Sequence, residues 1–251
     1  MAAAYDKFDY PLYWKNRSYE HESEVLVLKE FLSRIPVIDK IIDIGCGFGR
    51  LTPSYIHRGK KILLTDASAS LLALAREKYQ SYRKVNCLQT KIEHLPKKLH
   101  SRKFSLALMI RVMHHIEDPD QAIKNIGLIL EPRGYLILEF ANKLHSKAVF
   151  KNICRGNLTF PYDIFPSDKR SLKNIKDQSI PFLNFHPGKI IEILKNNNFE
   201  ILELRSVSNV RNNFLKENLP IEFLLWIEKI FQRPLAKIFF GPSIFVLARK
   251  I

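Results

Sequence analysis

The chain has 251 residues, of which 46% are hydrophobic, so it can bury a full core as one large domain. Its apolar runs are far shorter than the ~20 residues that a membrane-crossing helix needs, which excludes an integral membrane protein of that kind. The first residues carry neither a basic nor an apolar leader pattern, so we expect a cytoplasmic protein.

The net charge of +15 is densest in the second half of the chain. Such a balance suits nucleic acid, an anionic membrane surface or an acidic substrate, but a lysine-rich composition without any function gives the same value. Cys46, Cys87 and Cys154 are odd in number and far apart, which argues against a disulfide framework and against a cysteine-based zinc site.

The first ordered feature that the sequence predicts is an aromatic segment over residues 5–19, followed by a helix over about residues 20–33. In the helix, Val25, Leu28 and Leu32 recur at helical spacing, and the Ile35-Pro36 step ends it. The aromatic segment must pack on another part of the chain. Its aromatic members are Tyr5, Phe8, Tyr10, Tyr13, Trp14 and Tyr19.

Residues 41–49 read IIDIGCGFG, a run of strand-forming residues that ends in three glycines at alternate positions. Continuous apolar residues suit a parallel strand that is covered on both faces. Glycines permit positive φ and let a ligand approach the backbone. We therefore expect a buried strand that turns into a ligand loop, with amides of the loop and of a helix starting near residues 50–57 pointing into the cleft.

The spacing of the glycines limits which kind of ligand this loop can bind. The dinucleotide pattern G-x-G-x-x-G fails because Arg50 stands at its last position, and the phosphate-binding loop fails because no lysine follows Gly49. The pattern that fits, acid-x-G-x-G-x-G, resembles the first motif of class I S-adenosylmethionine-dependent methyltransferases. The resemblance implies that this stretch binds S-adenosylmethionine through Asp43, Gly45, Cys46, Gly47 and Gly49.

The aromatic segment resembles the N-terminal arm that many small-molecule methyltransferases fold over the cofactor. In such arms an Arg or Lys near a Tyr-Trp pair meets the methionine carboxylate, and Arg17 is the candidate here. Arg17 is equally explained as a solvated arginine beside packed aromatic rings.

A second strand over residues 61–65 ends at Asp66, and residues 68–82 form a helix. An acid at the tip of the second strand is placed to accept hydrogen bonds from both ribose hydroxyls. We therefore assign Asp66, with Ala67 beside it, to cofactor binding.

A third strand over residues 85–90 leads into KIEHLP, which resembles the family's third motif, G-D-A-x-x-L-P. Lys91 stands where the family has an Asp that holds the adenine, and lysine cannot accept a hydrogen bond from the adenine amino group. The amide of Ile92 can still bind the adenine, so Lys91 and Ile92 are both expected at the cofactor.

A fourth strand over residues 104–110 delivers RVMHHIEDP to the same end of the sheet, and this segment resembles the L-H-H-x-x-D-P stretch of type 11 methyltransferases, a group that includes the ubiquinone and menaquinone biosynthesis enzymes. Arg111 is expected at the cofactor. His115 is a candidate general base for a hydroxyl or amine acceptor, or a histidine that only packs, and His114 is a weaker candidate. No third metal ligand accompanies the pair, so we predict no metal site.

A helix from residue 119 to 130 and a fifth strand over residues 135–140 come next. Residues 142–185 then form a long insertion, and insertions of this length are usually functional lids or disordered. Because the insertion leaves the ligand end of the fifth strand, we expect it to wall the acceptor pocket. Its candidate substrate-binding residues are Phe160, Tyr162 and Phe165.

A helix over residues 187–196 and a strand over 199–207 precede a second insertion, residues 209–241. Its helix, residues 221–231, has apolar residues around most of its surface, so it must bury against the body, a second subunit or a membrane. With Lys229, Arg233 and Lys237 alongside, a peripheral membrane contact through 217–240 is a fair alternative to packing. A last strand over residues 243–248 is antiparallel in the family.

The sequence thus predicts a single methyltransferase domain, an α/β Rossmann-like fold with a mainly parallel seven-stranded sheet, helices on both faces and the last strand antiparallel. Residues 1–36 form an arm and helix, 37–142 the cofactor-binding core, and 143–185 with 209–241 a substrate cap. The function expected is O-, N- or C-methylation of a small-molecule or lipid-like acceptor.

Two other functions stay open. The charge favours a nucleic-acid methyltransferase, although RVMH replaces the [DN]-P-P-[YF] motif that base modifiers use and no nucleic-acid module is visible. Lys91 and the absence of a sure base favour an inactive cofactor-binding scaffold. The sequence does not indicate the oligomeric state.

Overall fold

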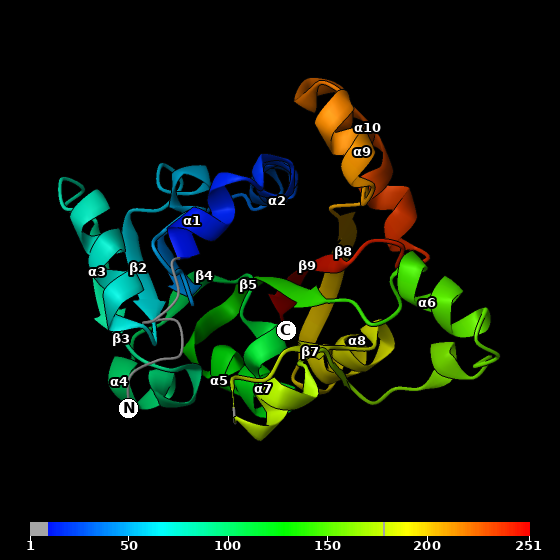
Figure 1. Cartoon of the computed structure of the whole chain (residues 1–251). Helices are drawn as coiled ribbons and strands as arrows, with labels where there is room; N and C mark the ends of the chain where they lie inside the picture. Colours follow the sequence, from blue (N-terminus) through cyan, green and yellow to red (C-terminus); the bar gives the residue numbers. More distant parts are fainter. Residues whose placement is uncertain (1–9, 178) are drawn as a thin grey trace.

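A seven-stranded sheet, in the order β3-β2-β1-β4-β5-β9-β8, runs through the molecule (Figure 1). This computed structural model describes residues 10–177 and 179–251. The strands are β1 (Lys40–Ile44), β2 (Lys61–Asp66), β3 (Val85–Gln89), β4 (Phe104–Met109), β5 (Leu130–Ala141), β8 (Phe199–Val207) and β9 (Ser243–Lys250). The predicted Rossmann-like fold is therefore confirmed.

The strands β1 to β5 pair in parallel, whereas β9 is antiparallel to both of its neighbours, β5 and β8. The last strand is thus antiparallel, as expected, and lies second from the edge of the sheet. Because β8 runs in the same direction as β1, the segments that follow β1, β2, β4, β5 and β8 all leave from one edge, the carboxyl edge.

Each face of the sheet carries its own hydrophobic core. Side chains of a strand alternate between the faces, so Ile41 packs in one core and Ile42 in the other. The first core is closed by α2 (Ser18–Ser33) and α3 (Ala69–Lys78). The second is closed by α4 (Leu95–Leu99), α5 (Pro119–Ile129) and α8 (Pro187–Asn196). The continuous apolar strands predicted from the sequence follow from this burial on both faces.

Two segments differ from the predictions. Residues 50–57 contain only a 3₁₀ turn, η2 (Thr52–Ser54), in place of a helix start. Here Tyr55 is fully buried and its hydroxyl bonds to Asp43, which turns the chain inward. Strand β5 also begins five residues before the predicted strand, because Leu130 pairs with Phe104 of β4 across an irregularity in the register.

The first insertion has secondary structure of its own. It contains α6 (Ser146–Ile153), η5 (Phe160–Tyr162), β6 (Ser167–Asp168), α7 (Leu172–Lys176) and β7 (Leu183–Asn184), and β6 pairs with β7. A buried lysine anchors it: the Lys143 ammonium donates to the carbonyls of Asp163 (2.6 Å) and Phe165 (2.7 Å) and pairs with the Asp163 carboxylate (2.7 Å). This segment is therefore an ordered subdomain on the carboxyl edge.

The second insertion forms α9 (Asn213–Asn218) and α10 (Ile221–Ala236). One face of α10, with Leu224, Glu228, Gln232 and Ala236, is buried against α2 and β8. Of the three expected alternatives, burial against the body of the protein is therefore the one that this face of α10 adopts. Other large apolar side chains of α10 remain exposed.

A buried carboxylate joins α10 to the rest of the fold. Glu228 accepts hydrogen bonds from the Tyr19 hydroxyl (2.6 Å) and from the amides of Ser208 (2.7 Å) and Asn209 (3.1 Å). Burial raises the pKa of Glu228, and burial together with Glu228 raises the pKa of Tyr19, so the phenol keeps its proton and donates. Tyr19 also accepts from the Val210 amide (3.0 Å), which fixes the segment after β8.

Within residues 10–177 and 179–251, no helix combines the length and the apolar character needed to cross a bilayer.

Replacing Tyr19 with Phe should lower the free energy of unfolding by about 1–3 kcal/mol, because a buried acceptor on Glu228 and the Val210 amide each lose a partner. Urea unfolding followed by circular dichroism would measure this. Tyr82→Phe, which changes an exposed tyrosine after α3, is the matched control and should stay within about 0.5 kcal/mol. Equal effects of the two changes would contradict the role given to the Glu228 network.

Candidate functional site

The glycine loop after β1 lies at the carboxyl edge in a conformation that only glycine adopts easily. Gly45, Gly47 and Gly49 have φ values of +73°, +56° and +72°. A Cβ on Gly45 would lie 2.2 Å from Val112, and one on Gly49 would lie 2.5 Å from the Tyr79 ring. Both close approaches and positive φ therefore require these residues.

The amides of this loop donate inside the protein. Those of Gly45 and Cys46 donate to the Thr65 carbonyl (2.7 and 3.0 Å), and that of Gly49 donates to the Cys46 carbonyl (3.0 Å). The amide of Gly47 donates to the Asp66 carboxylate (2.8 Å). The prediction that loop amides point into the cleft is wrong for these four, because the tight turn uses them to hold its own shape.

Asp66 ends β2 beside the loop, as expected. Its carboxylate accepts from the amides of Gly47 and Ser68, each at 2.8 Å, and its side chain is partly exposed. Ala67 follows, half-buried, and its carbonyl accepts from Gln89 (3.2 Å). The carboxylate therefore ties the loop to α3 and still faces the carboxyl edge.

Asp43 is buried beneath the same loop and accepts a hydrogen bond from the Tyr55 hydroxyl. Burial, with a smaller contribution from nearby Asp66, raises the pKa of Asp43 to about 7, although the Tyr55 bond opposes the shift. Cys46 lies above it with its pKa also raised by burial, so its thiol stays protonated. Near neutral pH, Asp43 can therefore either carry or release a proton.

The N-terminal helix α1 (Tyr10–Lys15) covers the loop. The Tyr10 ring lies 3.7 Å from the position that a Cβ of Gly47 would take, and it packs edge-on against Phe48. The hollow left between them holds 30 Å³, about the share of one water molecule in the liquid. A cofactor can therefore enter only if α1 moves. The hollow is lined by Tyr10, Asp43, Gly45, Cys46, Phe48, Arg50, Leu51, Ile110 and Arg111. Tyr5 and Phe8 of the aromatic segment lie outside the described residues.

A charged cluster that the sequence did not reveal closes the far wall of this hollow. Glu24 of α2 is fully buried, and its carboxylate pairs with the guanidinium groups of Arg50 and of Arg111 (2.6 Å). Burial opposes ionisation, but the two arginines outweigh it and lower the pKa of Glu24. The Trp14 ring of α1 packs 3.5 Å from the Arg50 guanidinium carbon, so the arm rests on this cluster.

Arg111 has a strained backbone with a φ of +61°, a conformation that is unusual for a residue with a side chain. Two carboxylates hold it there: its amide donates to Glu139 of β5 (2.8 Å), and its side chain donates to Glu24. Burial disfavours the charge of Arg111, but Glu24 and Glu139 outweigh this and raise its pKa. The guanidinium thus stays charged at the hollow, as the sequence assignment of Arg111 requires.

Arg17 does not line the hollow. It lies between α1 and α2, and its guanidinium carbon lies 4.2 Å from the centre of the half-exposed Tyr13 ring. The arginines that line the hollow are Arg50, in the loop after β1, and Arg111, directly after β4.

The residues after β3 lie at the same edge. Lys91 is exposed and precedes η3 (Ile92–His94), whereas Ile92 is buried. Lys91 therefore faces solvent at the tip of the strand next to β2.

His115 ends the short turn η4 (Met113–His115) after β4 and meets the first insertion. Its Nδ1 lies 2.7 Å from the Pro181 carbonyl oxygen, and the Phe182 ring packs against His114 with centroids 4.6 Å apart. Burial lowers the pKa of His115, and it lowers that of the more deeply buried His114 further. Both imidazoles are therefore neutral near pH 7.

The insertion reaches the histidine pair through residues other than those predicted. Phe160 is buried, with the Lys143 ammonium 5.4 Å from its ring, while Tyr162 and Phe165 are 83% and 73% exposed. The Lys143 anchor holds the backbone of 163–165 but leaves these two rings outside. The expectation that they line a pocket is not met, and Phe182 takes that place beside His115.

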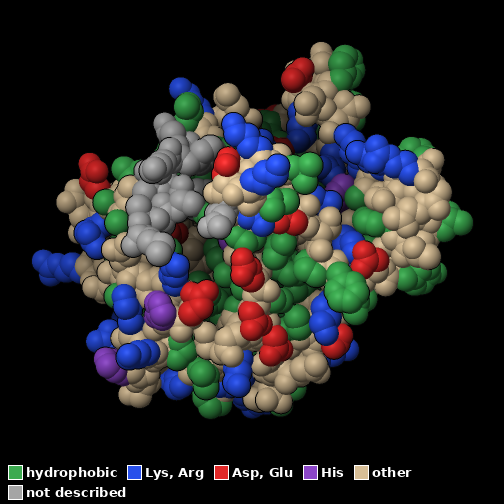
Figure 2. All heavy atoms as spheres, turned by 60° about the horizontal axis from the view of Figure 1, so that its bottom comes forward, with side chains coloured by type: hydrophobic (Ala, Val, Ile, Leu, Met, Phe, Trp, Pro, Cys, Tyr) green, Lys and Arg blue, Asp and Glu red, His purple; other side chains and the backbone are tan. Residues whose placement is uncertain are grey.

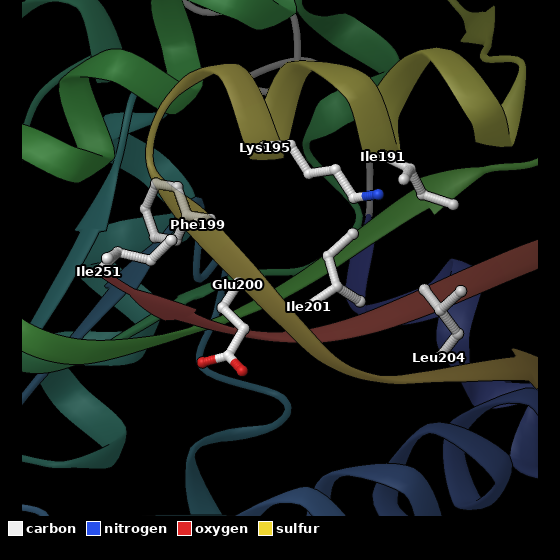
Figure 3. A pocket seen from close by; sticks show the side chains of 7 residues that line it. All are labelled: Ile191, Lys195, Phe199, Glu200, Ile201, Leu204 and Ile251. Atoms are coloured by element: carbon white, nitrogen blue, oxygen red, sulfur yellow. The ribbon is translucent and has the colours of Figure 1, made fainter.

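A larger hollow lies in a different region (Figure 3). It is a groove of 480 Å³ between α8 and β8, lined by Ile191, Lys195, Phe199, Glu200, Ile201, Leu204 and Ile251. Phe199 begins β8 and Ile251 follows β9, so the groove opens toward the amino edge, away from the glycine loop. It cannot serve the chemistry of the carboxyl edge.

Among the described residues, no group of three or more His, Cys, Asp and Glu side chains is arranged to hold a metal ion.

Residues 42–138 match the family model described as a methyltransferase domain. Over this stretch the chain is similar to methyltransferase domains, and its motifs resemble those of the type 11 class I S-adenosylmethionine-dependent methyltransferases. The matched stretch spans β1 to β5, so it contains the glycine loop, Asp66 and the histidine pair.

Two sequence relatives and one solved structure that resemble this chain are also named methyltransferases. A ubiquinone biosynthesis O-methyltransferase from Rickettsia typhi is 28% identical over 76% of this chain and 73% of its own length. One from Rickettsia bellii is 28% identical over 67% of this chain and 64% of its own length, just under two thirds. The solved N-methyltransferase NodS from Bradyrhizobium japonicum, in complex with S-adenosyl-L-homocysteine, has the same fold, with a TM-score of 0.62 at 14% identity, covering 98% of this chain and 94% of its own.

The residues at this edge of the sheet fit S-adenosylmethionine, the cofactor that the sequence motifs predict. Three glycines leave backbone space that side chains would fill, Asp66 offers a carboxylate at the tip of β2, and Arg50 and Arg111 offer positive charge at the opposite wall. We propose that Asp66 binds the ribose and that the two arginines bind the methionine carboxylate.

One feature of the sequence could have indicated the charged cluster: the position of Glu24 in its helix. Glu24 stands three and four residues before Val27 and Leu28 and seven before Phe31, all of which are buried, so it belongs to the apolar face of its helix. A charged residue on such a face needs a partner of opposite charge. No local pattern identifies Arg50 and Arg111 as those partners, because the loops after β1 and β4 bring them there.

Replacing Asp66 with Ala should weaken S-adenosylhomocysteine binding about 10- to 100-fold, since the ribose loses a charged acceptor and the Gly47 amide loses its partner. Isothermal titration calorimetry measures the affinity. Asp39→Ala, at the amino edge before β1, is the matched control and should bind as the wild type does. Unchanged affinity in Asp66→Ala would contradict the ribose assignment.

Replacing Asp43 with Asn should remove a pH dependence of stability. The folded state holds the Asp43 proton up to a pKa of about 7, whereas an unfolded Asp releases it near pH 4. This contribution to stability is therefore complete below pH 4 and disappears as the pH rises to 7. Urea unfolding between pH 4 and 8 should show a difference in the free energy of unfolding between wild type and Asp43→Asn. This difference should change between pH 4 and pH 7 and be constant above pH 7. A constant difference throughout would contradict the raised pKa.

Proposed function

We propose that the methyltransferase methylates a hydroxyl group of a small apolar acceptor, with His115 as the general base. The observation that carries this is the contact of His115 Nδ1 with the Pro181 carbonyl oxygen, 2.7 Å away. A carbonyl oxygen can only accept, so Nδ1 carries the proton and the basic lone pair belongs to Nε2.

The electrostatics of His115 support the same role. Burial lowers its pKa, so the imidazole is neutral and able to accept a proton near pH 7. Its position after β4 puts it at the carboxyl edge with the glycine loop, within the stretch that matches the methyltransferase domain model. Bound S-adenosylmethionine supplies a methyl group already activated by a sulfonium, so the chain has to align the acceptor, exclude water and remove one proton.

The acceptor surface consists of apolar and aromatic groups. Phe182, His114 and His115 form one cluster, and Pro181 and Phe182 belong to the insertion that covers the edge. Flat rings of this kind suit an aromatic acceptor. The relatives named ubiquinone biosynthesis O-methyltransferases support a phenolic quinone precursor over an amine or a carbon acceptor. The 143–185 insertion is then the wall of the substrate cap.

Two rival functions make different predictions. A nucleic-acid methyltransferase needs a phosphate-binding surface that leads to the histidine pair, and tight, salt-sensitive duplex binding would favour it. An inactive scaffold needs only cofactor binding.

A cytoplasmic location remains a prediction from the sequence.

The activity can be tested with labelled S-adenosylmethionine and an alkyl-substituted catechol as acceptor. Mass spectrometry should find one added methyl group on a phenolic oxygen. Gly45→Val is the negative control, because its side chain would collide with Val112 in a strained backbone. Cofactor binding without transfer to phenols or to nucleic acid would favour the scaffold and contradict the proposal.

Replacing His115 with Gln should lower kcat about 100-fold while S-adenosylhomocysteine affinity stays within about twofold. The wild-type rate should rise with pH as His115 loses its proton, with the midpoint of the rise below the ordinary histidine pKa of about 6.5, because burial lowers the pKa of His115. His115→Gln should lack this rise.

The exposed His57, changed to Gln, is the matched control and should keep both the rate and the pH profile. A His115→Gln enzyme with the wild-type profile would assign the proton transfer to another group.

A further inference from the structure

We propose that α6 with residues 154–158, together with α9 and α10, forms a docking surface for an anionic lipid bilayer. We call these residues, 146–158 and 213–238, the basic–apolar surface. The proposal concerns membrane binding and does not depend on which acceptor the enzyme methylates.

Large apolar side chains project from both parts of this surface. Phe150 and Leu158 are 72% and 66% exposed, and Phe214, Trp226 and Ile238 are 68%, 58% and 66% exposed. On α10, Phe223 stacks on Trp226 with ring centroids 5.9 Å apart, and Ile230 continues the same stripe one turn further on. Exposed apolar groups that line up at helical spacing and include a Trp are typical of helices that lie in a membrane interface.

Basic side chains flank these apolar groups. Lys147, Lys151 and Arg155 belong to the first part, which contains no Asp or Glu between residues 145 and 158. Lys229, Arg233 and Lys237 recur every four residues along α10, beside the stripe of Phe223, Trp226 and Ile230, and all three are exposed. In Figure 2 the lobe at the right, which holds α6, carries apolar side chains on its outer rim and Lys and Arg side chains along its upper side.

The two parts are joined by contacts at their ends. Arg211, before α9, bonds to His145, the residue before α6, at 2.9 Å, and the Ser146 amide donates to the Phe240 carbonyl, also at 2.9 Å. Both insertions leave the carboxyl edge of the sheet (Figure 1). A bilayer bound there would lie at the edge that holds the cofactor and the histidine pair.

The charge identifies the occupant. The cations Lys147, Lys169 and Arg211 lie around His145, and burial together with these three groups lowers the pKa of His145 to about 4. This region therefore repels a second copy of the same positive surface and attracts an anion. Nucleic acid would be attracted too, but it offers no apolar phase for Phe150, Trp226 and Ile238. Anionic phospholipid satisfies both the basic and the apolar groups.

Vesicle flotation of the full chain, without cofactor or acceptor, tests this proposal. Vesicles of phosphatidylcholine with about 30% phosphatidylglycerol should bind the protein, and pure phosphatidylcholine should bind it at least tenfold more weakly. The triple variant K229Q/R233Q/K237Q should lower the partition coefficient at least tenfold.

The matched control is K61Q/R83Q/R102Q, which removes the same charge from exposed positions at the start of β2 and just before β3 and β4, at the amino edge. It should bind as the wild type does. Equal loss in both triple variants would show general charge attraction and overturn the proposal.

Insertion has its own readout, because the chain has two tryptophans and Trp14 is buried. Brominated acyl chains should quench the fluorescence of the wild type but not that of Trp226→Phe. Absence of vesicle binding, or binding to duplex DNA or to a second copy through the same lysines, would overturn the proposal. Because these assays need no methyl transfer, their failure is distinct from a failure of the proposed reaction.

Discussion

The arrangement of the site depends on one buried charge, the carboxylate of Glu24. It joins α2, the loop after β1 through Arg50 and the loop after β4 through Arg111. Removing one partner of such a buried group typically costs about 3–5 kcal/mol, because the other charge is left without compensation. The pairs therefore fix where the two cofactor loops end relative to the N-terminal helices.

This constraint also explains why the arm closes on the glycine loop. Trp14 packs on the guanidinium group of Arg50, and Tyr10, one turn earlier, then reaches Gly47. Trp14, which packs on the charged cluster, and Tyr10, which fills the hollow, both belong to α1, a helix of six residues. Entry of the cofactor must therefore separate α1 from this cluster, which couples cofactor binding to the position of the arm.

Most of the fold could be predicted from the sequence because its strands are buried on both faces. Apolar runs such as residues 41–44 and 104–110 can only belong to covered parallel strands, and Asp66 follows from its place at the end of one of them. The contacts of Arg17 and of Tyr162 could not be predicted in this way. Each depends on the direction that a loop takes, and that direction goes with a particular side-chain contact, with Tyr13 in one case and with Lys143 in the other.

The connection order of the sheet gathers everything specific to this chain at one edge. A parallel strand delivers its following segment to the carboxyl edge, and β9 returns from that edge because it is antiparallel. Insertions after β5 and β8 therefore start from the same edge as the glycine loop. The two insertions, which differ in structure, lie close enough there for His145 and Arg211 to bond. The fold thus allows both insertions to vary without changing the two cores beneath them.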